Sequence, residues 1–183
     1  MPIPVFYIQK DMKKLIAFLV LALSISAFAQ TKDDRAYLVK VGDMAPNFSM
    51  KLTNGKTVKL SDLKGKVVML QFTASWCSVC RKEMPFIERD IWQKHKSNSK
   101  FVLIAVDRDE PLETVVNFAK SIPISYQIGL DPKADIFALY AVREAGITRN
   151  VIIDKTGKIV FLTRLYDEAE FKKMVKVIDG LVK

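Results

Sequence analysis

Cys77 and Cys80 are the only two cysteines in the 183 residues. A structural zinc site generally takes four Cys or His ligands, and the chain adds a single histidine, His95, which disfavours such a site. A purely structural disulfide across so short a ring would remove little entropy from the unfolded chain. The spacing therefore favours a reversible dithiol–disulfide couple, in which Cys77 attacks as a thiolate and Cys80 resolves the mixed disulfide.

The residues around this pair predict the elements that position it. Val67–Phe72 is an apolar run that follows the turn signal Lys64-Gly65-Lys66, and its length and composition are typical of a buried strand. After Cys77 the apolar residues recur every three to four positions, as in a helix: Val79, Met84, Phe86, Ile87, Ile91 and Trp92. Cys77 should therefore lie at the start of a helix, where free N–H groups and the helix dipole stabilise a thiolate.

The rest of the chain alternates between predicted strands and helices. Asn54-Gly55 lies between two short strand-like segments and indicates an N-terminal β-hairpin. Phe101–Val106 is a second buried strand, and a helix beginning at Pro111 follows it, so these strands should be parallel. A further helix is expected after Asp131-Pro132. Residues 151–153 and 158–162 predict an antiparallel hairpin, and a closing helix carries one apolar stripe: Phe171, Met174, Val175, Ile178 and Leu181.

The N-terminus has the three parts of a secretory signal peptide. A charged segment, Met12-Lys13-Lys14, precedes an apolar stretch from residue 15 to 28, and Ala27-Phe28-Ala29 is a small-x-small cleavage pattern. We expect a signal peptide over residues 1–29, with Met12 as an alternative start, a lead-in segment over 30–40 and one domain over 41–183. A retained membrane anchor is the alternative, although the apolar stretch is short for one. Export to an oxidising compartment agrees with the low cysteine count.

The chain carries a net charge of +9. Its lysines are spread along the sequence and form no concentrated basic block or base-stacking motif, which argues against nucleic-acid binding. A solvated surface, with weak attraction to anionic lipids, is the simpler interpretation.

Three motifs together resemble a known family. Trp76-Cys77-x-x-Cys80 with Lys82-Glu83-Met84-Pro85 resembles the TlpA/ResA-like branch of extracytoplasmic thiol–disulfide oxidoreductases, and so do the segments 42–48 and 60–66. The resemblance covers about residue 41 to the C-terminus. It implies an α/β fold: a thioredoxin-like three-layer α/β/α sandwich, with a mixed sheet and an added N-terminal β-hairpin.

The resemblance also implies a function. The expected protein is periplasmic or otherwise extracytoplasmic and soluble after signal cleavage, and it reduces disulfides of other exported proteins without a cofactor or metal. A membrane electron donor would return it to the dithiol form. The sequence itself does not determine whether the protein reduces disulfides or forms them.

Glu83 and Trp76 are further candidates beside the dithiol. The family carries a glutamate at the place of Glu83 that helps proton transfer around the thiols, although a glutamate in an early helical turn is also common as a solvated residue. Trp76 could shield the disulfide and offer an apolar surface to a substrate. Thioredoxins carry a buried acid at the place of Gln71, and an amide cannot relay a proton, which leaves Glu83 as the candidate base.

Ile147 and Thr148 occupy the place where the family has a substrate-binding loop that ends in a cis-proline facing the dithiol. A cis bond before a residue other than proline costs about 2.5–4 kcal/mol, so we expect a trans Ile147–Thr148 peptide or a reshaped loop. Thr148 should still bring its hydroxyl close to Cys77, although a plain turn residue is the alternative.

Two other functions compete with the oxidoreductase. A peroxiredoxin-like peroxidase would need Pro and Thr at the places of Leu70 and Ala74. A Cu(I)-binding carrier of the thioredoxin fold would suit two thiolates, but such carriers resemble a Cys-x-x-x-Cys pattern with a distant histidine. The chain has neither full pattern.

Overall fold

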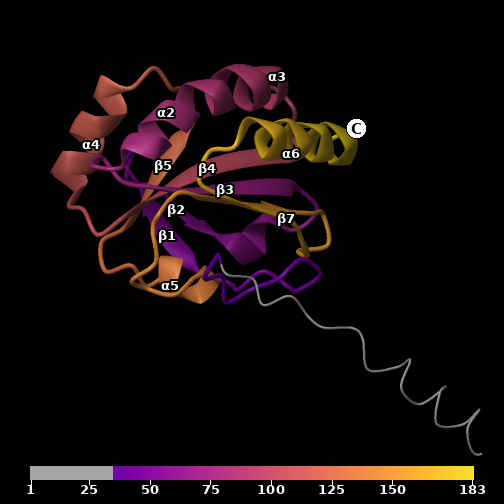
Figure 1. The fold of residues 1–183 in the computed structure, drawn as a ribbon, viewed down its shortest axis with the longest axis horizontal. Helices are drawn as coiled ribbons and strands as arrows, with labels where there is room; N and C mark the ends of the chain where they lie inside the picture. The colour runs from indigo at the N-terminus through magenta and orange to yellow at the C-terminus, as the bar shows by residue number, and fades with distance from the viewer. Residues whose placement is uncertain (1–34) are drawn as a thin grey trace, which may run out of the picture. The chain divides into compact units, whose positions relative to one another are not determined.

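A computed structural model describes residues 35–183, and Figure 1 shows a mixed sheet with helices packed against it. The predicted signal peptide and residues 30–34 lie outside the described residues. The elements are, in order, β1 (Ser49–Leu52), β2 (Thr57–Lys59), η1 (Leu60–Leu63), β3 (Val67–Thr73), α2 (Ser78–Ile87), η2 (Glu88–Trp92), α3 (Gln93–His95), β4 (Phe101–Arg108), α4 (Leu112–Ser121), β5 (Gln127–Asp131), α5 (Phe137–Tyr140), β6 (Arg149–Ile153), β7 (Ile159–Arg164) and α6 (Glu168–Leu181).

The strand β3 lies near the middle of a seven-stranded sheet of order β2-β1-β5-β4-β3-β6-β7. It pairs in parallel with β4 and antiparallel with β6. All seven of its residues are buried, and its side chains alternate between two core clusters on the two faces of the sheet. This double burial explains why the strand reads as a continuous apolar run.

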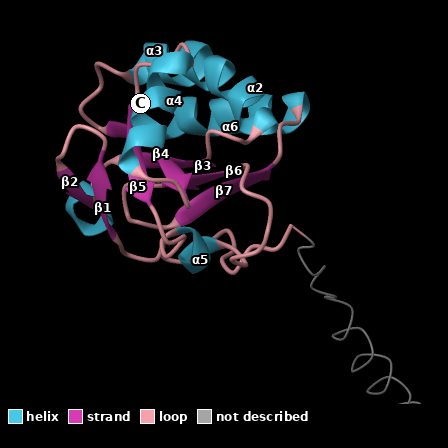
Figure 2. Cartoon of the chain, turned by 90° about the vertical axis from the view of Figure 1, so that its left-hand side faces the viewer, coloured by secondary structure: helices cyan, strands magenta, loops and turns pink. Residues whose placement is uncertain are grey.

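Helices cover the two faces unequally (Figure 2). Met84 of α2, Phe118 of α4 and Phe171 of α6 share one core cluster, so these helices cover the same face of the sheet. The opposite face packs against α5, where Phe72 contacts Phe137 at a centroid distance of 5.4 Å. The predicted α/β class is confirmed, as are the antiparallel hairpins β1–β2 and β6–β7.

Two helical segments differ from the sequence prediction. The helix expected after Asp131-Pro132 is only the single turn α5, because the Asp131 carboxylate accepts hydrogen bonds from the backbone N–H groups of Ile136 and Phe137 and holds the preceding residues in turns. The long helix after Cys80 is also interrupted, since α2 passes into the π-helical η2 at Glu88. Pro85, which has no N–H to donate, lies three residues before this change.

Residues 35–40, part of the expected lead-in segment, contact the domain directly. The Tyr37 hydroxyl donates to the Thr163 carbonyl oxygen at 2.5 Å, and the Leu38 N–H donates to Tyr140 O at 2.9 Å. Within residues 35–183 no helix is both long and apolar enough to cross a membrane.

Candidate functional site

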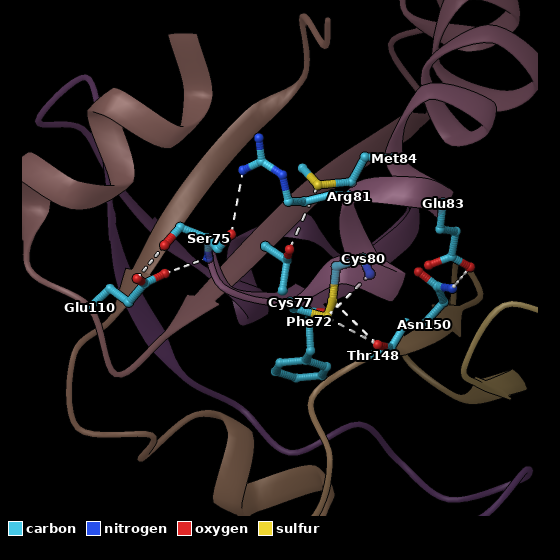
Figure 3. The surroundings of a disulfide bond; sticks show 11 residues. Phe72, Ser75, Cys77, Cys80, Arg81, Glu83, Met84, Glu110, Thr148 and Asn150 are labelled. Carbon is cyan, nitrogen blue, oxygen red and sulfur yellow. Dashed lines mark hydrogen bonds between the residues drawn. A yellow bond between two sulfur atoms is a disulfide. The ribbon is translucent and has the colours of Figure 1, made fainter. Parts of the chain in front are cut away.

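The two cysteines lie where β3 ends and α2 begins, and they form a disulfide in this structure (Figure 3). Cys77 is the N-cap residue of α2, and its sulfur accepts a hydrogen bond from the backbone N–H of Cys80 at 3.1 Å. Cys80 is fully buried, whereas Cys77 keeps 6% of its surface exposed. Cys77 is therefore the more exposed of the two residues, and its sulfur accepts a backbone N–H at the start of the helix.

Thr148 lies against both sulfurs, as the sequence predicted. Its Oγ1 is 3.2 Å from the sulfur of Cys77 and 3.3 Å from that of Cys80. The described residues contain no cis peptide bond, so the predicted trans Ile147–Thr148 bond is confirmed. The Ile147 side chain is buried in the same core cluster as Phe72 and Cys77, which leaves only its backbone to meet a substrate.

Trp76 is the most exposed aromatic side chain next to the disulfide, with 60% of its surface accessible. The guanidinium carbon of Arg108 lies 5.8 Å from its ring centroid and 4.5 Å from that of Phe137. Arg108 also donates to the carbonyl oxygens of Arg143 and Ala145, at 3.2 and 3.0 Å. It thereby ties the end of β4 to the segment that leads to Thr148.

Glu83 is buried beneath α2, with 1% of its surface exposed. Its Oε1 accepts a hydrogen bond from the Asn150 amide at 2.8 Å, and Asn150 is the β6 residue opposite Gln71 in the sheet. Burial raises the pKa of Glu83 to about 7, although the hydrogen bond from Asn150 offsets part of this effect. The alternative of a solvated glutamate is therefore wrong. Gln71 itself accepts a hydrogen bond from the Tyr126 hydroxyl at 2.8 Å.

A carboxylate that the sequence analysis did not single out holds the segment before Cys77. Glu110 accepts hydrogen bonds from the N–H and the hydroxyl of Ser75, both at 2.5 Å (Figure 3). Asp107, at the end of β4, is fully buried, and burial followed by repulsion from Glu110 raises its pKa to about 8. The signal in the sequence was the cluster of three acidic residues within 107–110, directly after a strand predicted to be parallel to β3.

The geometry suits thiol chemistry and offers no evident metal site. Within residues 35–183 no three His, Cys, Asp or Glu side chains are grouped so that they could hold a metal ion. Thr148 and the N-terminus of α2 lie against the disulfide, and Trp76 directly precedes Cys77 in the chain.

Comparisons with known proteins give the same picture. Residues 40–178 match the family model described as Redoxin. The thiol-disulfide oxidoreductase ResA of Bacillus cereus is 36% identical over 122 residues, which are 67% of this chain and 68% of that protein.

Solved structures are similar as well. A provisionally named protein disulfide isomerase from Bacteroides thetaiotaomicron is 65% identical, with a TM-score of 0.79, and the match covers 80% of this chain and 92% of that one. A provisionally named thiol:disulfide interchange protein DsbE from Chlorobium tepidum is 29% identical, with a TM-score of 0.70, and covers 79% and 99%.

Replacing Thr148 with valine should weaken the thiolate of Cys77. The hydroxyl can donate to the sulfur after reduction, and a hydrogen bond to a charged group contributes about 1.5–3 kcal/mol. We expect the pH profile of Cys77 alkylation by iodoacetamide to move upward by about one pH unit or more in Thr148→Val. Thr148→Ser keeps the hydroxyl and is the control. Identical profiles for all three proteins would contradict this role.

Glu83→Gln should become more stable relative to wild type as the pH rises. The carboxyl titrates near 4.5 in the unfolded chain and near 7 in the folded protein. Between these values the unfolded state gives up its proton first, so the free energy of unfolding of the wild type falls as pH rises and stays lowered above pH 7. The variant has no carboxyl to ionise and does not lose this stability. The pKa difference between the unfolded and folded states corresponds to about 3 kcal/mol in the free energy of unfolding.

Urea unfolding of both proteins at pH 4 and pH 8 measures the effect. Asp107 titrates in both proteins, so its contribution cancels in the difference. Glu113→Gln, which changes an exposed side chain of α4, is the control and should show no such gain. A wild-type-to-variant difference that is the same at both pH values would refute a raised pKa at Glu83.

Proposed function

The chain belongs to the Redoxin family, in which it is a relative of the ResA thiol–disulfide oxidoreductases, and on that premise we propose that it reduces disulfides of other exported proteins. The observation that carries the proposal is the Cys77–Cys80 pair at the N-terminus of α2. It combines a first cysteine that keeps some exposed surface and whose sulfur accepts a backbone N–H with a fully buried second cysteine one turn later. This arrangement supports attack by Cys77 and resolution by Cys80.

The reaction proceeds in two exchanges that start from the dithiol. The Cys77 thiolate attacks one sulfur of the substrate disulfide, so that a mixed disulfide forms and the first substrate thiolate leaves. The Cys80 thiolate then attacks the Cys77 sulfur, and the second substrate thiolate leaves. Two electrons have passed to the substrate, whose thiolates take up two protons, and the Cys77–Cys80 disulfide is the oxidised product.

Glu83 is the proposed proton acceptor for this cycle. It lies on α2 three residues after Cys80, and its pKa of about 7 allows it to take up and return a proton near neutral pH. Trp76 and the backbone of Ile147–Thr148 are the proposed contacts for the substrate polypeptide. Trp76 directly precedes Cys77 and its ring is exposed, and Thr148 lies against the Cys77 sulfur.

The cellular setting is part of the same proposal. The signal-like residues 1–29 support export to an extracytoplasmic compartment, and thiol or disulfide-bearing exported proteins would be the partners. Because each cycle ends in the disulfide, a donor of two electrons is required, and a membrane protein that carries reducing equivalents outward would supply them. The peroxidase and the Cu(I) carrier gain no support from the site.

The two cysteines should differ sharply when each is replaced. Cys77→Ser removes the attacking thiolate, so insulin reduction should fall to background. Cys80→Ser leaves the mixed disulfide unresolved, so the protein should accumulate covalently bound to its substrate, as a non-reducing gel with mass spectrometry would show. Ser78→Ala is the control and should retain turnover. Equal activity in the two cysteine variants would overturn the assignment.

The reduction potential decides the direction of electron flow. We expect a value near or below about −230 mV for a reductase, towards the thioredoxin end of the scale, and a value near about −120 mV would identify an oxidant. The measurement follows the fraction of the pair that is trapped by an alkylating tag across a series of thiol redox buffers. If no reversible couple appears, the dithiol mechanism is wrong.

A further inference from the structure

Arg164 presents a cation beside the segment that faces the disulfide. It is the last residue of β7, and the sheet pairs it with Arg149, the first residue of β6. The next residue, Leu165, donates its N–H to the carbonyl oxygen of Thr148 at 3.1 Å. Arg164 is thus fixed next to the residue whose hydroxyl lies 3.2 Å from the Cys77 sulfur.

The guanidinium of Arg164 lies on Gly146. A β-carbon at Gly146 would overlap with Nη2 of Arg164 and would lie 3.2 Å from its Cζ. The backbone of Gly146 is not in the left-handed region, so no turn requires a glycine here. The glycine instead allows the Arg164 guanidinium to lie close to the backbone. The glycine leaves room for a guanidinium two residues before Thr148.

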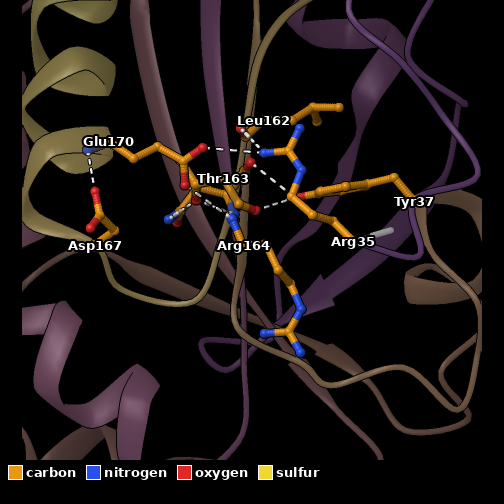
Figure 4. A network of polar contacts seen from close by, with 8 residues as sticks. Arg35, Tyr37, Leu162, Thr163, Arg164, Asp167 and Glu170 are labelled. Carbon is orange, nitrogen blue, oxygen red and sulfur yellow. Dashed lines mark hydrogen bonds and ion pairs between the residues drawn. The ribbon is translucent and has the colours of Figure 1, made fainter. Parts of the chain in front are cut away.

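This cation has no carboxylate of its own within the part of the chain that the structure describes. The nearby Glu170 forms its ion pair with Arg35, at 3.2 Å, and reaches Arg164 only through a backbone contact of 3.4 Å. Figure 4 shows the Arg164 side chain extending away from Glu170. Its Nη1 is buried without an acceptor, and removing a guanidinium from water without a partner is costly.

A second arginine and an exposed leucine lie beside Arg164. Arg149, directly opposite in the sheet, is fully buried and lies over the Tyr37 ring at 4.5 Å. Leu165, with 47% of its surface exposed, adds apolar area beside the cation.

We propose that Arg164 is a specificity residue that binds a carboxylate side chain of the substrate polypeptide close to its disulfide. A guanidinium binds a carboxylate through charge-assisted hydrogen bonds, and a substrate carboxylate would neutralise a cation that forms no ion pair among the described residues. The preferred substrates are then disulfides with an aspartate or glutamate nearby. The inference rests on the proposed reductase function and names its substrate class.

The test uses reduced protein and synthetic peptides that each contain one internal disulfide. A single Asp is moved through the two positions before and the two positions after one cysteine, and Asn at the same positions gives neutral matches. Wild type should reduce at least one Asp peptide about tenfold faster than its Asn match at subsaturating peptide, a factor that corresponds to about 1.4 kcal/mol. The difference should lie in the half-saturating concentration rather than in the maximal rate.

Two variants remove the cation in different ways. In Arg164→Gln the Asp-to-Asn rate ratio should fall to about one, because the charge is lost. In Gly146→Ala the charge stays but the guanidinium is displaced, and the ratio should also fall. Arg164→Lys should keep an intermediate preference. The ratio is taken within each protein, so a general loss of reactivity or stability cancels.

The outcomes separate this inference from the proposed function. If wild type reduces neither these peptides nor the uncharged hydroxyethyl disulfide, the reductase function itself is wrong. If wild type reduces them but shows no Asp preference, or if the preference survives in Arg164→Gln, the specificity role of Arg164 is overturned while the reductase function stands.

Discussion

The pairing of β3 with a parallel strand on one side and an antiparallel strand on the other is the constraint on which the site depends. Because β4 runs parallel to β3, it ends at the same edge of the sheet, where Glu110 reaches Ser75. Because β6 runs antiparallel, it begins at that edge, and Thr148 precedes it. Segments that lie 35 and 71 residues apart in the sequence therefore meet at one dithiol.

Two carboxyl groups of this part of the structure have pKa values that burial raises. Glu83 is buried under α2 and Asp107 at the end of β4, and their pKa values are raised to about 7 and about 8. A neutral carboxyl costs far less to bury than a carboxylate, so an apolar sheet can hold both groups near neutral pH. The same burial lowers the free energy of unfolding at high pH, because the folded protein must then hold the ionised groups away from water.

The backbone of the site could be predicted from the sequence because local patterns determine it. The apolar run before Cys77 and the helical spacing after it place the pair. The position of Thr148 opposite the dithiol came from the resemblance to the family, whose loop before the late strand faces the two cysteines, and Thr148 does lie against both sulfurs. The remaining contacts depend on tertiary packing. Neither the bonds between Glu110 and Ser75 nor the inward direction of Ile147 leaves a periodic signal, and the short α5 follows from the use of Asp131 as a backbone acceptor.

Residues 145–148, the segment before β6, contact the sulfurs through one residue and Arg164 through another. Arg108 holds it at the Ala145 carbonyl and Leu165 holds it at the Thr148 carbonyl, so it keeps its form without the rigidity of a proline. The Thr148 side chain faces the sulfurs, while Gly146 faces Arg164. Because these contacts involve different residues, a substitution at Arg164 would alter the proposed substrate preference without a change in the atoms that touch the sulfurs.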